Sequence, residues 1–276
     1  MFFLAEMNGF FIISILNFIS LFETQTVFNQ VSTTYPHYYG IPLTSSNAIS
    51  KGWIKLLDCN DNNSPGNVYY LNDDLSSMPI YNNDGYISGI ILGMNNPGLS
   101  SEMYPFNNYT FPSNNSIFWG IEALFRDPTS ICQLNSTNTS NIIGDRLWFT
   151  NGNGIGKYFE TPLKYDENKL DSLGYYTGAC FVGMGLHIWR YISVNENCND
   201  IYPIFLLYNH GNLDSWGIAM AHDDRPYLDS FRWEHPGGNE LKYFFKNNQI
   251  PTCLPNQGTL STQHIFMSNP IWYNCL

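Results

Sequence analysis

Histidines late in the chain are the residues best suited to chemistry. Five of the six lie after residue 186, at His187, His210, His222, His235 and His264. Imidazole transfers protons near neutral pH and binds borderline metals such as zinc. Three imidazole ligands would leave an open position for water on such an ion. We therefore predict a divalent metal site whose ligands are His187, His235 and His264, with Glu234, Asp223 or Asp224 assisting.

The alternative is that each of these imidazoles completes the core by donating to a backbone carbonyl. His187 stands among aliphatic neighbours in the segment GMGLHIW, which predicts burial. His264 alternates with Thr262 and Phe266, so one strand face would carry all three. No His-x-His pair or other short ligand spacing occurs in the segment, and this favours the core interpretation.

Cysteine usage indicates an oxidising compartment. The six cysteines are Cys59, Cys132, Cys180, Cys198, Cys253 and Cys275. An even number predicts a disulfide framework and leaves no thiol over as a catalytic nucleophile. Six cysteines allow about fifteen connectivities. Proximity along the chain favours Cys180–Cys198 and Cys253–Cys275, which leaves Cys59–Cys132 as the third pair.

Two further features agree with export from the cytosol. The apolar run FFIISILNFISLF at residues 10–22 has the length of a signal-peptide core and is too short to span a bilayer. We predict a signal peptide at residues 1–26. Five Asn-x-Ser/Thr sequons predict glycosylation. Their asparagines are Asn62, Asn108, Asn114, Asn135 and Asn138.

Charge and hydropathy exclude some partners. The formal net charge is −11. An acidic chain repels phosphate backbones and anionic lipid surfaces, so we expect no nucleic-acid partner. No stretch after residue 22 reaches the length of a membrane-spanning helix, so we also expect no stable membrane insertion.

The composition predicts the fold class. Aromatic residues make up 16% and charged residues 13% of the chain, a balance that favours strands joined by turns. We predict a mainly β protein (β-rich α+β), with antiparallel sheets, a few short helices and disulfide links. Residues 27–276 would form one extracellular domain, and two lobes dividing near residues 136–156 are the alternative.

The predicted elements place the histidines on strands. Residues 178–194 read as one long strand interrupted by Gly183 and Gly185, and residues 260–268 as another. Other strands are expected at residues 68–71, 86–92, 115–126, 146–150, 201–211 and 213–221. Short helices are expected within residues 44–57 and 240–247.

These features favour a secreted, disulfide-bonded glycoprotein over an enzyme of a recognisable class. The leading hypothesis is a non-enzymatic protein that binds an extracellular ligand or protein partner, or belongs to an extracellular matrix. The alternative is an extracellular metal-binding protein or metal-dependent enzyme that uses the late histidines.

Overall fold

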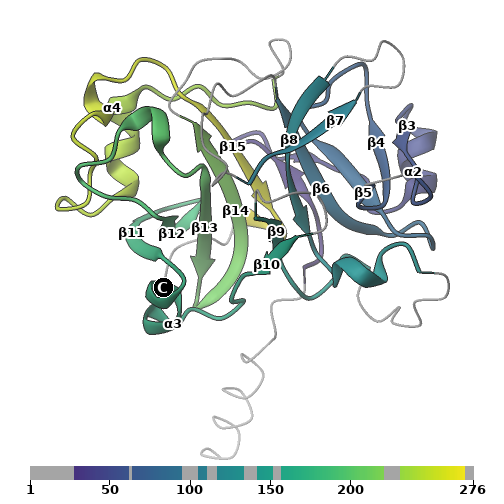
Figure 1. The fold of residues 1–276 in the computed structure, drawn as a ribbon, viewed down its shortest axis with the longest axis horizontal. Helices are drawn as coiled ribbons and strands as arrows, with labels where there is room; N and C mark the ends of the chain where they lie inside the picture. Colours follow the sequence, from purple (N-terminus) through teal and green to yellow (C-terminus); the bar gives the residue numbers. More distant parts are fainter. Residues whose placement is uncertain are drawn as a thin grey trace, which may run out of the picture.

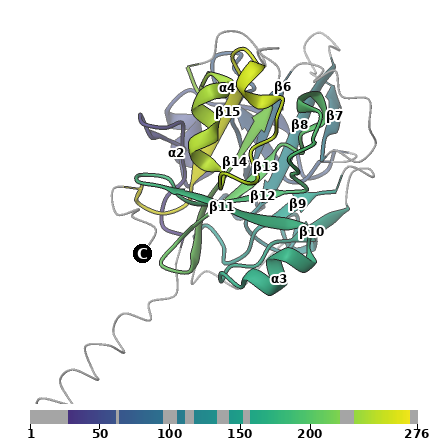
Figure 2. The ribbon, with the colours of Figure 1, turned by 90° about the vertical axis from the view of Figure 1, so that its left-hand side faces the viewer.

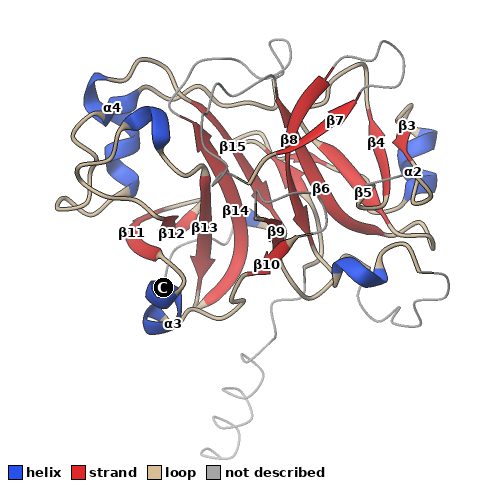
Figure 3. Ribbon diagram, in the orientation of Figure 1, coloured by secondary structure: helices blue, strands red, loops and turns tan. Residues whose placement is uncertain are grey.

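Two antiparallel β-sheets dominate the computed structural model, with short helices at the periphery (Figure 1, Figure 3). The structure describes residues 28–61, 64–94, 105–110, 117–133, 142–151, 157–220 and 231–270. The prediction of a mainly β protein with antiparallel sheets is confirmed. Several predicted features lie outside the described residues. They are the signal peptide, Asn62, Asn114, Asn135, Asn138, Asp223, Asp224 and Cys275.

The first sheet, called here the seven-stranded sheet, contains seven strands of the described part of the chain. In spatial order they are β11 (Tyr175–Phe181), β12 (Gly185–Arg190), β13 (Ile204–Asn209), β14 (Asn212–Met220), β15 (Ser261–Phe266), β1 (Ser32–Thr33) and β2 (Tyr39–Gly40). The middle of this sheet is a meander from β11 to β14. Neighbours in sequence therefore pair directly, and only β15 and β1 bring distant segments together.

The second sheet, called the eight-stranded sheet, comes from the earlier part of the described chain. Its path runs through β10 (Tyr158–Glu160), β9 (Trp148–Thr150), β8 (Ile117–Leu124), β6 (Ile87–Met94), β5 (Met78–Tyr81), β4 (Asn67–Tyr70) and β3 (Ile54–Leu57), and β7 (Asn107–Thr110) also pairs with β8. The two sheets share one hydrophobic core. In that core the Phe149 ring of β9 meets the Trp216 ring of β14 edge to face, with centroids 4.9 Å apart.

The helices are short and lie outside the sheets. They are α2 (Ser45–Ser50), α3 (Glu167–Ser172) and α4 (Gly238–Leu241), with 3-10 turns η1 (Pro128–Ser130), η2 (Cys198–Asp200), η3 (Lys242–Phe244) and η4 (Leu254–Asn256). Thr44 caps α2 by accepting the Asn47 N–H, and Asp166 caps α3 by accepting the Lys169 N–H. We call residues 231–256, which include α4, η3 and η4, the C-terminal layer.

Strand alternation gives the seven-stranded sheet two buried faces. In β13, Ile204 and Leu206 pack in the core between the sheets, whereas Phe205 and Leu207 belong to a separate cluster on the opposite side. Successive strand residues point to opposite faces, so this split is the expected result of a strand buried on both sides. The second cluster packs against the C-terminal layer, which lies over the outer face of the sheet (Figure 2).

Two predictions of local structure need correction, and one helix was not predicted. Residues 178–194 form a hairpin instead of one long strand, because Gly183 and Gly185 both adopt positive φ and turn the chain between β11 and β12. Residues 54–57 form β3 instead of continuing a helix from Thr44. The helix α3 was not predicted. Six residues give too short a window for a clear helical period.

The disulfide pattern was predicted in part. Cys59 pairs with Cys132 as expected. Cys198 pairs with Cys253, so the predicted pairs Cys180–Cys198 and Cys253–Cys275 are both wrong. The Cys198–Cys253 bond joins η2 to the C-terminal layer across 55 residues. Pairing by sequence proximity failed because the layer folds back over the sheet.

Within the described residues, no helix is long and apolar enough to cross a membrane.

A buried carboxylate in β14 makes stability depend on pH. Burial raises the pKa of Asp214 to about 7, although Ser268 and the charge of Lys164 act in the opposite direction. The folded pKa lies above the unfolded value, so the contribution of Asp214 to stability is most favourable at low pH and falls as pH rises from about 4 to 7. At pH 8 we expect Asp214→Asn to raise the free energy of unfolding by about 3 kcal/mol, and at pH 4 to change it little.

Urea unfolding at both pH values measures this difference. Asp171→Asn, at an exposed position in α3, is the matched control and should leave the pH dependence unchanged. An Asp214→Asn protein with the wild-type pH dependence would contradict the assignment.

Candidate functional site

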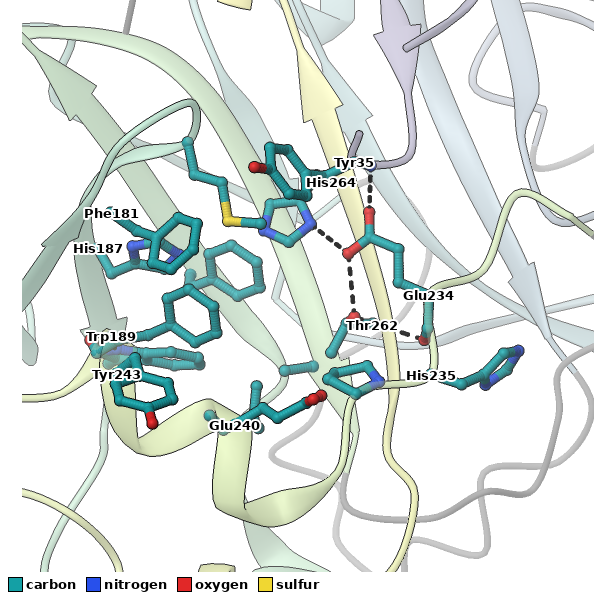
Figure 4. A pocket seen from close by; sticks show the side chains of 16 residues that line it. Tyr35, Phe181, His187, Trp189, Glu234, His235, Glu240, Tyr243, Thr262 and His264 are labelled. Carbon is teal, nitrogen blue, oxygen red and sulfur yellow. Dashed lines mark hydrogen bonds and ion pairs between the residues drawn. The ribbon is translucent and has the colours of Figure 1, made fainter. Parts of the chain in front are cut away.

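A cavity of about 480 Å³ lies between the outer face of the seven-stranded sheet and the C-terminal layer (Figure 4). The sheet contributes side chains from β11 to β15, and the layer contributes α4, η3 and the segment before them. The lining is mainly apolar and aromatic. These lining residues are Tyr35, Phe181, Met184, Trp189, Phe205, Ala219, Pro236, Leu241, Tyr243 and Phe244.

Trp189 attaches the C-terminal layer to the sheet. Its indole N–H donates to the Phe244 carbonyl at 2.9 Å, and its ring stacks on Phe245 with centroids 4.4 Å apart. A buried indole N–H needs such an acceptor, so this bond fixes both the ring and the η3 backbone. Gly178 permits the close approach, since a Cβ there would lie 2.5 Å from the same Phe244 carbonyl oxygen.

Gly217 in β14 leaves room for an aromatic wall of the cavity. A Cβ at this position would lie 2.3 Å from the Phe205 ring and 2.6 Å from the Gln263 carbonyl oxygen. The Phe205 ring therefore lies across the strand, where it meets the His187 ring at 5.5 Å and the His264 ring at 5.1 Å between centroids. A larger residue at position 217 would displace this ring.

The three predicted metal ligands His187, His235 and His264 all line this cavity. His187 and His264 are buried on the outer face of the sheet, with ring centroids 6.3 Å apart. His235 is exposed, and its ring points away from the other two imidazoles (Figure 4). Among the described residues, no group of three or more His, Cys, Asp or Glu side chains is arranged to hold a metal ion. The metal assignment stays a prediction.

Burial keeps the His187 imidazole neutral. Its pKa is lowered to about 3, mainly by removal from water and secondly by the neighbouring His264, although hydrogen bonds to backbone carbonyls act in the opposite direction. Its Nδ1 lies 3.2 Å from the Gly185 carbonyl oxygen, and its ring packs against Phe244 with centroids 4.6 Å apart. These contacts match the alternative interpretation of His187 as a core histidine.

His264 forms a pair with Glu234, which the sequence analysis had named as an assisting group. The distance from His264 Nδ1 to Glu234 Oε2 is 2.7 Å. The same carboxylate accepts the Tyr35 backbone N–H at 2.6 Å on Oε1 and the Thr262 hydroxyl at 3.2 Å on Oε2. Each carboxylate oxygen thus has a donor, which makes a partly buried charge tolerable.

Main-chain pairing places Glu234 beside β15. The Glu234 N–H donates to the Thr262 carbonyl at 2.8 Å, and the Thr262 N–H donates to the Glu234 carbonyl at 2.9 Å. Glu234 thereby extends the sheet beyond the point where β1 leaves β15. Arg232, two residues before Glu234, is also held in place. Its carbonyl accepts a hydrogen bond from the Thr34 hydroxyl at 2.6 Å, and its guanidinium lies 3.5 Å from an Asp74 carboxylate oxygen.

Tyr35 is a residue of the candidate site that the sequence did not indicate, and Thr262 is one that the sequence placed beside His264 without a role. Tyr35 lies 199 residues before its partner Glu234, so no local pattern connects them. Thr262 lies two residues before His264, and the predicted strand alternation already put both on one face. The exposed Asn108 is the one predicted glycosylation residue within the described ranges, and it lies in β7, away from the cavity lining.

The Glu234 carboxylate should stabilise the site substantially. Glu234→Ala would leave the Tyr35 N–H, Thr262 and His264 without their acceptor, and we expect the free energy of unfolding to fall by about 3 kcal/mol. Glu167→Ala, at an exposed position in α3, should change it by only about 0.5 kcal/mol. Chemical unfolding of both variants measures the difference, and equal stabilities would contradict the described pairing.

No protein-family model, curated protein or solved structure matches this chain. The chemistry of the cavity therefore has to be inferred from its own residues.

Proposed function

We propose that this protein is a secreted, non-enzymatic binding protein whose cavity takes a small, largely apolar molecule. The observation that carries the proposal is the aromatic cavity of about 480 Å³ beneath the C-terminal layer. Ligand sites are concave, mostly apolar and fitted with a few polar groups, and cavities of roughly 300–1,000 Å³ hold small molecules. The lining here has this composition, with the buried His264 and the partly buried Glu234 as a polar pair.

The physical driving force for binding is removal of apolar surface from water. Each Å² of apolar area buried contributes about 25 cal/mol, before the cost of immobilising the ligand. Aromatic rings such as Trp189, Phe205 and Phe244 add geometric preferences that favour a flat, unsaturated ligand. Tyr243 is 60% exposed and lines the same cavity, so it marks an accessible side of the site.

Several observations support the extracellular part of the proposal. The disulfides Cys59–Cys132 and Cys198–Cys253 are of the kind that persists in oxidising compartments. Asn108 and the Thr110 of its sequon are both exposed on β7, which is compatible with glycan attachment. The signal-peptide prediction at residues 1–26 belongs to the same proposal.

Filling the cavity tests the proposed function. Ala219 lies on β14, lines the cavity and is 3% exposed. Its replacement by Phe would place a ring in the space that a ligand needs. The wild-type protein should bind naphthalene-type probes, and a probe at 100 times its Kd should add about 2.7 kcal/mol to the free energy of unfolding. Ala219→Phe should lose at least ten-fold in affinity.

Isothermal titration calorimetry and thermal unfolding with the probe provide the measurements. Leu173→Phe, outside the cavity and partly exposed, is the matched control and should bind as the wild type does. Absence of probe binding to the wild type, or full binding by a folded Ala219→Phe protein, would refute the proposed function.

A further inference from the structure

His264 has one ring nitrogen that is buried without a hydrogen-bond partner. Nδ1 is engaged by Glu234, whereas Nε2 has no partner among the described residues. The His264 residue is 5% exposed, so bulk water does not satisfy this atom. Figure 4 shows this nitrogen on the side of the ring away from Glu234, and His264 is one of the residues that line the cavity. Such an atom is costly unless a bound molecule pairs with it.

The hydrogen bonds around Glu234 determine which tautomer His264 adopts. An ionised carboxylate only accepts, so the His264 Nδ1 must donate to Glu234 Oε2 across the 2.7 Å contact. In a neutral imidazole Nε2 then carries a lone pair and acts as an acceptor. An N–H at Nε2 would have no acceptor among the described residues.

The neighbouring polar groups in the buried part of the cavity are already engaged. The Thr262 hydroxyl donates to Glu234, and the neutral His187 ring is held near the Gly185 carbonyl. A ligand that enters this part of the cavity therefore meets aromatic surface and the acceptor nitrogen of His264. This part of the cavity therefore favours an apolar molecule that carries one hydrogen-bond donor.

We propose that the cavity binds a phenol or an apolar alcohol whose hydroxyl donates to His264 Nε2. This inference rests on the proposed function and adds the ligand class. Glu234 acts as a positioning residue, because it holds the tautomer that makes Nε2 an acceptor.

Three probes of nearly equal shape separate this inference from the proposed function. They are 1-naphthol, 1-methoxynaphthalene and naphthalene, titrated into the wild-type protein by calorimetry. A buried hydrogen bond contributes about 0.5–1.5 kcal/mol net, so 1-naphthol should bind up to about ten-fold more tightly than the other two. Equal affinities, or a preference for the ether, would overturn the ligand class and leave the apolar cavity standing. Binding of none of the three would overturn both.

A single substitution should reverse the tautomer. In Glu234→Gln the side-chain carbonyl can still accept the hydrogen bond from the Tyr35 backbone N–H. The side-chain NH₂ group then points toward His264 Nδ1. Nδ1 must then accept, and Nε2 becomes a donor. The preference for 1-naphthol should disappear, and 1-acetylnaphthalene, which only accepts, should gain affinity about five-fold or more relative to wild type. Glu167→Gln is the matched control and should keep the wild-type preference.

The ¹⁵N chemical shifts of the His264 ring report its tautomer directly. They would not change in Glu234→Gln if Glu234 had only a structural role. The wild type should carry its proton on Nδ1, and Glu234→Gln should carry it on Nε2. A wild-type proton on Nε2 overturns the inference. If Glu234→Gln fails to fold, His264→Phe keeps the ring shape and removes both nitrogens. A folded His264→Phe protein that still prefers 1-naphthol over its methyl ether also overturns the inference.

Discussion

Burial of the seven-stranded sheet on both faces is the constraint on which the candidate site depends. β13 and β15 are buried along their whole length, and alternate residues serve two different cores. One face packs against the eight-stranded sheet, so the other face needs a separate cover. The C-terminal layer supplies it, held by the Cys198–Cys253 disulfide and by the Trp189–Phe244 hydrogen bond. The cavity lies where this irregular layer meets the regular sheet.

The same constraint explains the polar pair inside an apolar cavity. His264 lies on the outer face of β15 because its position in the strand alternation puts Ile265 into the inner core. A buried imidazole needs a partner, and Glu234 is brought to it by main-chain pairing with Thr262. The carboxylate also accepts a hydrogen bond from the Tyr35 backbone N–H, so three segments distant in sequence meet at one charged group. These hydrogen bonds give a donor to each carboxylate oxygen and a partner to His264 Nδ1, so the pair orders the site.

The predicted histidine cluster was informative about location, although the metal chemistry stays untested. Three imidazoles that were chosen for their residue type line one cavity. Their roles differ because their surroundings differ. His187 is neutral in an aromatic wall, His264 is paired with a carboxylate, and His235 faces away. Residue type alone identified the segments that meet, and the surroundings decide what each ring can do.

The sequence by itself determined the fold class and most strand positions, since alternation and aromatic content act locally along each strand. It also indicated that His187 and His264 lie on buried strand faces. Tertiary structure decided the hairpin at Gly183 and Gly185, the Cys198–Cys253 pairing and the Tyr35 contact to Glu234. These depend on how the C-terminal layer folds back over the sheet. Contacts between segments far apart in sequence leave no periodic trace in either segment, so only the folded chain reveals them.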